Sequence, residues 1–264
     1  MPEYVQQAML FLQDRSTHAL TSLVLLAVLF IPLERLCAAR EQKIFREGFW
    51  TDLGFFLGQY LLFIALANFI IHLVIQPLAS VSVLGQIHIL FAQIPWGLQL
   101  VIALVLGDFV AYWAHRLQHR VDILWRFHAV HHSSHEVDWL AAHREHPLDG
   151  LYTQFMVNIP AIVCGFAFSE VMLLIFFRGL WAIFIHSNVR IKVGIFGYLL
   201  GSPHLHHWHH AKGRDVGNYA NLAPWLDVVF GTHYAPEGEP EEMGLDEDYP
   251  TRYMAMLIKP FTKT

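Results

Sequence analysis

Long apolar runs alternate with polar segments along this chain, and the lengths of the runs predict helices that cross a membrane. Residues 19–34 carry almost no charge, residues 53–77 form a longer apolar run, and a third run covers about 96–114. A helix of about 20 apolar residues can cross a hydrocarbon layer of about 30 Å. We therefore expect three membrane-spanning helices, with the charge-free segment 78–95 as the loop between the second and the third.

Two shorter apolar stretches follow, at about 151–168 and 171–186. Each is short for a complete span, so the pair predicts a helical hairpin that enters the membrane and returns. The segment 116–150 is rich in histidine, arginine and acids, and such side chains are too costly to place in lipid. Together with the polar chain from Asn188 onward, it predicts a cap outside the membrane.

These elements together predict one all-α integral-membrane domain, residues 1–264, with polytopic membrane helices and a histidine-rich helical cap. Residues 1–95 form its N-terminal membrane anchor, and residues 96–235 contain the histidine-rich region. Residues 236–264 form an acidic C-terminal tail. We expect its part 236–250 to be mobile, because segments rich in charge and poor in apolar residues bury too little surface to order themselves.

The positions of the basic residues predict how the chain is oriented. No Lys or Arg occurs between Arg46 and Arg116, whereas the connection 35–46 contains four basic residues. Short cytoplasmic loops carry the excess of Lys and Arg in membrane proteins. We therefore expect the connection 35–46 and the cap to lie on the cytoplasmic side, which puts the histidine clusters on the cytoplasmic face of the membrane.

The composition supports a membrane protein and excludes several other classes. Hydrophobic residues make up 55% of the chain and charged residues only 15%, compared with about 25% charged residues in a typical soluble domain. The net charge is −5 and no basic tract is present, so we expect no nucleic-acid partner. Two cysteines are too few for a disulfide framework or a four-cysteine iron–sulfur cluster.

Three histidine clusters carry the candidate chemistry. One is an HxxxH pair and two are HxxHH triplets, and residues three and four apart on a helix share a face. Converging neutral imidazoles commonly hold a transition metal, and three clusters supply more ligands than one ion can use. The spacing therefore predicts two metal ions, held by His115, His119, His128, His131, His132, His206, His209 and His210.

Two carboxylates are candidates for partners of these ligands. Asp108 lies seven residues before His115, on nearly the same helical stripe. A metal-ligating histidine usually donates its second ring N–H to a carboxylate or a carbonyl, and we expect Asp108 to be such an acceptor or a ligand itself. The alternative is an acid paired with an arginine. Asp227 is expected to be a hydrogen-bond partner of a ligand or a structural cap.

The order of the clusters behind apolar spans resembles the fatty acid hydroxylase and sterol desaturase superfamily of integral-membrane di-iron enzymes. The segment DFVAYWAHRLQH (108–119) is similar to the first histidine box with its preceding acid. HREHPLDG (143–150) resembles the segment after the second box in sterol desaturases. HHWHHAKGRDVGNYANLAPWLDVVFGTH (206–233) resembles the third box and its sequel. The resemblance covers about residues 100–235.

This resemblance implies that the metals are two iron ions and that O₂ is a co-substrate. It implies further histidine ligands between the second and third boxes. His186 sits where one is expected, and His146 is a second candidate through the His-Pro pair of the sterol branch. His143 is better explained as a polar loop residue, and His207 would ligate only if the helix register shifted by one residue.

The function implied by the resemblance is hydroxylation or desaturation of a C–H bond of a membrane lipid, with residues 96–235 as the catalytic region. The chain has no flavin, haem or iron–sulfur motif of its own, so we expect a separate electron donor, a ferredoxin or a cytochrome b5-type protein with its reductase. A zinc hydrolase is disfavoured because no HExxH motif is present. A histidine-rich metal transporter or metal-binding membrane protein is the alternative, although transporters tend to place their ligands near the bilayer midplane.

Overall fold

A computed structural model of the chain describes residues 3–64, 66–67, 69–70, 73, 82–191 and 194–262. Within these residues the regular elements are all helices, and β pairing is limited to two isolated bridges, Ala38 with Val189 and Ala211 with Met243. The predicted all-α class is confirmed.

Three helices are long and apolar enough to cross a membrane among the described residues. They are α1 (Glu3–Leu36), α5 (Trp96–Arg120) and α8 (Phe168–His186), and their candidate spans are Asp14–Leu36, Trp96–Arg120 and Ser169–His186. The first and third predicted runs therefore lie within longer helices. These spans identify the chain as an integral membrane protein.

The predicted second span, 53–77, has no counterpart among these three helices. Its described part is the end of α2 (Phe49–Gly58), a π-helical turn, Gln59–Phe63, and further helical residues at 64, 66–67, 69–70 and 73. Residues 65, 68, 71, 72 and 74–77 lie outside the described residues. The predicted loop 78–95 is wrong over much of its length, because α4 (Ser82–Phe91) occupies it. Absence of charge does not prevent a helix, and this segment consists mainly of apolar residues with few helix-breaking ones.

The predicted hairpin is formed by α7 (Pro147–Val163) and α8. The expectation that both arms are too short to span is wrong for α8, whose 19 residues extend over about 28 Å. Glu170, which falls between the two predicted arms 151–168 and 171–186, lies in the first turn of α8. Its carboxylate accepts the backbone N–H of Ala167 at 2.8 Å and so caps the helix that it was expected to interrupt.

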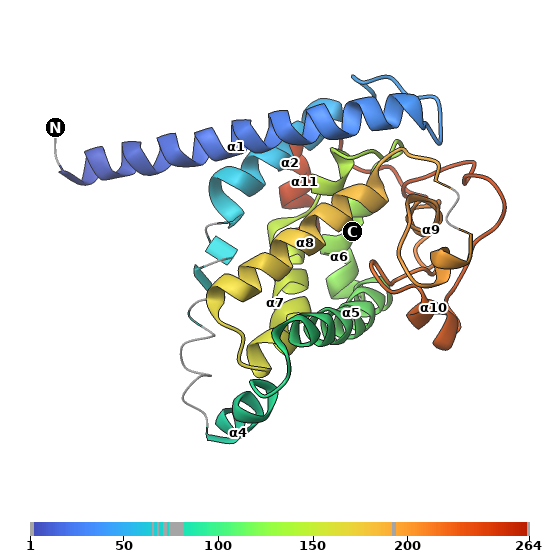
Figure 1. Cartoon of the computed structure of the whole chain (residues 1–264). Helices are drawn as coiled ribbons and strands as arrows, with labels where there is room; N and C mark the ends of the chain where they lie inside the picture. The colour runs from blue at the N-terminus through green and yellow to red at the C-terminus, as the bar shows by residue number, and fades with distance from the viewer. Residues whose placement is uncertain are drawn as a thin grey trace.

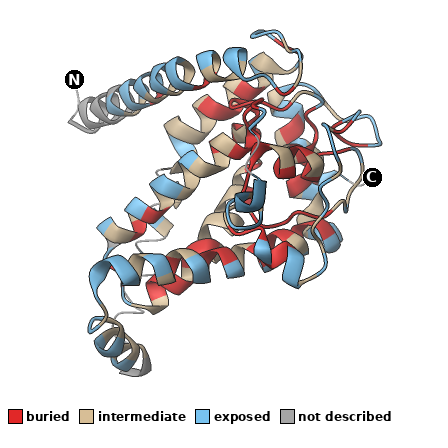
Figure 2. Cartoon of the chain, turned by 45° about the vertical axis from the view of Figure 1, so that its right-hand side comes forward, coloured by how far each residue is buried: buried red, intermediate tan, exposed pale blue. Residues whose placement is uncertain are grey.

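The buried residues of the long helices gather at the end that meets the cap. Along the rest of these helices many apolar side chains are exposed. Figure 2 shows the buried residues concentrated where α5, α6 (Asp122–His132) and the short cap helices meet, whereas residues 14–36 of α1 are mostly exposed or intermediate. Val28 of α1 and Phe176 of α8 are each 69% exposed. Exposed apolar faces on helices of this length fit contact with lipid.

Short helices and loops form the cap at one end of the long helices (Figure 1). The helices are α6, α9 (Pro203–His209), α10 (Trp225–Val229) and α11 (Tyr253–Ile258), with 3-10 turns at Ala141–His143, Gly194–Tyr198 and Lys259–Phe261. The acidic segment 236–250 packs against this cap, although we expected it to be free. The Trp208 indole donates to the Gly238 carbonyl at 3.0 Å, and Met243 is buried.

A buried network of charged side chains joins Arg46 and Asp52, which lie just before and in α2, to Asp138 and Arg144. The Arg46 guanidinium donates to the carboxylates of Asp52 at 2.7 Å and Asp138 at 2.5 and 2.7 Å. Arg144 donates to the second oxygen of Asp52 at 2.5 Å. Buried charges are tolerated when each is paired and hydrogen-bonded, so this network fixes α2 against the segment 138–144.

Candidate metal centre

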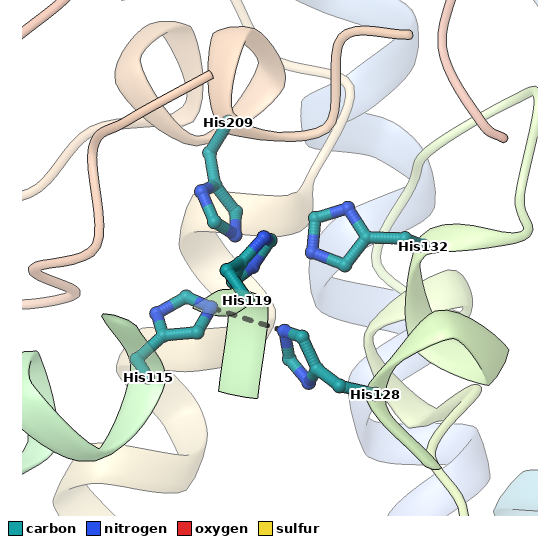
Figure 3. A group of neighbouring side chains, drawn as sticks. All are labelled: His115, His119, His128, His132 and His209. Carbon is teal, nitrogen blue, oxygen red and sulfur yellow. Dashed lines mark hydrogen bonds between the residues drawn. The ribbon is translucent and has the colours of Figure 1, made fainter. Parts of the chain in front are cut away.

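Nine buried histidines gather in two groups at the end of α5 and α8 that faces the cap. Within each group one ligand atom per residue lies within 4.8 Å of all the others. Figure 3 shows the first group converging on one point. The five-histidine group comprises His115, His119, His128, His132 and His209, and the four-histidine group comprises His131, His186, His206 and His210.

The five-histidine group is built where α5 turns into α6. His115 and His119 lie one turn apart at the end of α5, and the extended residue Val121 reverses the chain into α6. This turn brings His128 of α6 back against α5, with the Nε2 atoms of His115 and His128 3.2 Å apart. His209 of α9 closes the group, with its ring centroid 4.5 Å from that of His115.

The four-histidine group is centred on His186, the last residue of α8. Its Nε2 atom lies 3.0 Å from Nε2 of His131, 2.9 Å from Nε2 of His206 and 3.3 Å from Nε2 of His210. His206 and His210 are one turn apart in and directly after α9. The group therefore joins a membrane-spanning helix to two cap helices.

The second ring nitrogen, Nδ1, fixes the tautomer of most of these histidines. In each case it faces an oxygen that only accepts hydrogen bonds, so Nδ1 carries the proton and Nε2 of a neutral ring carries a lone pair. The pairs are His115 with the Tyr219 carbonyl (2.8 Å), His119 with the Arg214 carbonyl, His128 with the Asp149 carboxylate (2.9 Å), His131 with the Arg144 carbonyl (3.1 Å), His186 with the Ala182 carbonyl (2.7 Å) and His209 with the Gly217 carbonyl (2.7 Å).

The rings in the cap are neutral at pH 7. Burial lowers the pKa of His131 to about 4 and lowers the pKa of His128, His132 and His209 well below the ordinary value. Lone pairs of neutral rings cannot hydrogen-bond one another, and an unsatisfied buried acceptor costs about 1–3 kcal/mol. The facing Nε2 atoms therefore fit a bound cation, and imidazole is a ligand for iron, zinc, copper and nickel.

Several ring nitrogens have no hydrogen-bond partner at all among the described residues. They include Nε2 of His119 and of His209, and both nitrogens of His132. The two groups also adjoin, because the rings of His132 and His210 stack with centroids 4.4 Å apart. Two neighbouring metal ions would satisfy these atoms, so the donor set fits the metal pair expected from the sequence.

His146, expected as a ligand, lies outside both groups. It is the N-cap of α7, where its Nδ1 accepts the Leu148 N–H at 3.1 Å and its Nε2 faces the Leu257 carbonyl at 3.2 Å. Both ring nitrogens are occupied, which leaves none for a metal. The His-Pro pair thus starts a helix, with Pro147 at its first position.

His143 and His207 are also outside the groups. The His143 Nδ1 donates to the Gln59 side-chain oxygen at 2.8 Å. The ring nitrogens of His207 face the Glu239 carboxylate at 2.6 Å and the Ser187 carbonyl at 3.1 Å. His207 thereby ties the acidic segment 236–250 to the end of α8, directly after His186.

Asp108 and Asp227 contact backbone near the centre and touch no histidine of either group. Asp108 accepts the Ala223 N–H at 2.8 Å. Its carboxylate also lies 3.5 Å from the Arg178 guanidinium, so the alternative expectation of an acid paired with an arginine is the one that the structure shows. Asp227 accepts the N–H groups of Tyr219 at 2.8 Å and Ala220 at 2.9 Å. Since the Tyr219 carbonyl accepts from His115, both acids position a ligand indirectly, through the segment 219–223.

The carboxylate that does contact a ligand is Asp149, which the sequence reasoning missed. It accepts from His128 Nδ1 at 2.9 Å and from the Gln118 side-chain amide at 2.6 Å. Asp149 lies in the first turn of α7, where acids are favoured for helix stability alone. Its burial, with 3% exposed, is the feature that separates it from an ordinary capping acid.

Comparison with known proteins agrees with this geometry. Residues 100–232, half of the chain, match the family model described as fatty acid hydroxylase. The chain belongs to the fatty acid hydroxylase family. The matched segment contains both histidine groups from His115 to His210.

The similar members of the family act on lipids, by their names. An ornithine lipid hydroxylase of Rhizobium tropici is 31% identical over 65% of this chain and 53% of its own length. The human alkylglycerol monooxygenase is 33% identical over 52% of this chain and 31% of its own length. A putative Delta(7)-sterol-C5(6)-desaturase of Arabidopsis thaliana is 28% identical over 54% of this chain and 50% of its own length.

The matches thus span about half or less of these relatives. No solved structure matches the chain.

Proposed function

We propose that this fatty acid hydroxylase family member is a membrane lipid oxygenase. It uses O₂ and external electrons to hydroxylate or desaturate a C–H bond of a lipid, at two iron ions held by the nine grouped histidines. The observation that carries the proposal is the convergence of buried, neutral imidazoles whose lone pairs face one another. The relatives that act on ornithine lipids, alkylglycerols and sterols support the reaction class and the lipid substrate.

The chain supplies position, tautomer and exclusion of water. Bound iron would supply the O₂-dependent oxidation of an alkyl C–H bond, which side-chain acids and bases cannot perform. Backbone carbonyls of Tyr219, Arg144 and Gly217 hold the Nδ1–H groups and thereby direct Nε2 of each ligand inward. Burial of all nine rings keeps bulk water from them.

The position of the groups favours an enzyme over a metal transporter. The histidines lie at the ends of α5 and α8 and in the cap, whereas transporters place ligands near the bilayer midplane on broken helices. The excess of Lys and Arg on one side supports a cytoplasmic site. O₂ chemistry of this kind needs two electrons, so we infer a separate donor, a ferredoxin or a cytochrome b5-type protein with its reductase.

The test uses the full chain in lipid nanodiscs. We expect about two iron ions per chain by elemental analysis, O₂ consumption when a reductant is added, and a lipid product that contains one new hydroxyl group or double bond. Comparing the lipids of cells with and without the gene identifies the substrate. Tight iron binding without O₂ consumption, together with iron movement across liposome membranes, would establish the transporter instead.

A further inference from the structure

A cavity of about 530 Å³ lies between the end of α1, the loop 37–44 and the cap. It is at the same end of the molecule as the histidine groups, because the chain after α1 pairs with the chain after α8. The Ala39 N–H donates to the Asn188 carbonyl at 3.2 Å, and Asn188, two residues after His186, lines the cavity. A molecule in this cavity would therefore lie at the membrane surface beside the proposed metal centre.

Three cations line the cavity and retain N–H donors that no residue in the described ranges uses. One guanidinium nitrogen of Arg35 donates to the Gln42 carbonyl at 2.9 Å, and one of Arg40 donates to the Glu241 carbonyl at 3.1 Å. The ammonium of exposed Lys43 has no partner among the described residues. These groups can bind an anion.

Two acids on the same wall retain acceptor oxygens. One oxygen of Glu34 accepts the N–H groups of Trp139 and Asn188, each at 2.9 Å, while its other oxygen has no partner in the described part of the chain. Glu41 is exposed and likewise unpaired there. Asp138, the third acid of the lining, is already paired with Arg46. The cavity thus offers binding groups for both an anion and a cation.

Apolar side chains extend the cavity toward the membrane. Ile31, Ile44 and Phe49 belong to the lining. Beside it, Phe45 and Trp50 are 67% and 72% exposed and stack with ring centroids 6.0 Å apart. Trp is enriched at the membrane–water interface, and these apolar side chains adjoin the charged ones, so the ligand that fits is an amphiphile.

We propose that this cavity binds the headgroup of a zwitterionic lipid. The anionic part of the headgroup contacts Arg35, Arg40 and Lys43, its ammonium contacts Glu34 and Glu41, and its chains run along the exposed apolar face of α1. An amino-acid lipid and a zwitterionic phospholipid share this chemistry. The role of the bound lipid as substrate rests on the proposed function, whereas the binding itself does not.

The experiment measures lipid binding to metal-free protein in nanodiscs, by native mass spectrometry of the lipids retained when the nanodiscs are dissociated. The probes are an ornithine lipid, phosphatidylethanolamine and the anionic phosphatidylglycerol. Retention of one or both zwitterionic lipids above phosphatidylglycerol supports the proposal, and the two identify which source is preferred. Equal retention of all three, or preference for phosphatidylglycerol, overturns it.

Two charge variants sharpen the test, because each removes an exposed charge that forms no ion pair or hydrogen bond with another described residue. Lys43→Gln and Glu41→Gln should each weaken retention of the zwitterionic lipid by about threefold, as expected for one exposed ion pair. Lys259→Gln, the same change beside a different cavity, should leave it unchanged. If Glu41→Gln leaves retention unchanged or strengthens it, the ammonium contact does not exist and the proposal is overturned.

Failure of this proposal is distinguishable from failure of the proposed function. Binding is measured without iron, so an inactive protein can still show headgroup selectivity. Conversely, an active oxygenase whose Lys43→Gln and Glu41→Gln variants keep the wild-type KM for every lipid would retain the proposed function, and the lipid bound in the cavity would not be its substrate.

Discussion

His131 and His186 face each other with Nε2 atoms 3.0 Å apart, while the Nδ1 atom of each ring faces a backbone carbonyl. Neither neutral ring has a proton to place between the two Nε2 atoms. The contact is therefore a pair of acceptors held together by α6 and α8, and a bound metal ion would make it favourable. This relationship explains why the end of a spanning helix meets a cap helix here.

Replacement of His186 should empty the four-histidine group and spare the other. We expect His186→Ala to lower the iron content of purified protein from about two ions per chain to about one, because the five-histidine group lacks none of its ligands. Elemental analysis of the protein measures this. His204→Ala removes a half-buried cap histidine outside both groups and should keep both ions. A His186→Ala protein with full iron content would show that His186 is not a ligand.

Asp149 should act on metal affinity through His128. Asp149→Asn replaces the carboxylate that accepts from His128 Nδ1, and loss of such a partner typically costs about tenfold or more in metal affinity. Competition with a chelator measures the affinity. Asp246→Asn, at an exposed acid of the tail, is the control. Equal affinity of the two variants would assign Asp149 to helix stability only.

The spacing of the histidines predicted that the eight boxed side chains would gather, but their partition into two groups came from the structure. Residues i and i+4 point in nearly the same direction on a helix, while i+3 and i+4 differ by about 100°. Each HxxHH triplet is accordingly divided, since His128 and His132 stay together and His131 joins the other group. His206 and His210 stay together, and His209 joins the group of α5.

Features that depend on tertiary contacts could not be predicted from the sequence. The carbonyls that orient the ligands belong to residues such as Tyr219 and Arg144, whose side chains give no hint of this role. His146 was expected to ligate because of its place in a motif, yet its ring caps α7. The class and the first and third spans followed from the lengths of the apolar runs. The gathering of the eight boxed histidines followed from their spacing, because spacing reports which side chains share a face.

Gly217 should be needed for the position of His209. Its φ is +105°, and a Cβ atom there would lie 2.3 Å from the Thr232 carbonyl oxygen. In Gly217→Ala the backbone must shift, and the Gly217 carbonyl that accepts from His209 Nδ1 shifts with it. We expect loss of stability of about 1–3 kcal/mol and weaker metal binding by the five-histidine group.

Gly213→Ala is the matched control for Gly217→Ala. Gly213 has a φ of +123°, but the nearest atom to its added Cβ is 3.7 Å away. Both variants therefore share the backbone strain, and only Gly217→Ala adds the collision. Thermal unfolding and metal titration compare them. If the two behave alike, the close approach to Thr232 is unimportant.

His143 should make the stability of the metal-free protein depend on pH. Burial lowers the pKa of His143 to about 4, whereas the unfolded chain has a histidine pKa of about 6.5. Between these values the unfolded state binds a proton that the folded state does not, so stability falls as the pH falls from about 6.5 to 4, by about 3 kcal/mol for this residue.

His143→Phe keeps a ring against Phe56 and removes this contribution. We expect the difference in unfolding free energy between the variant and the wild type to change by that amount between pH 7 and pH 4. Parallel pH profiles for wild type and His143→Phe would mean that burial does not lower the pKa of His143 in the folded protein.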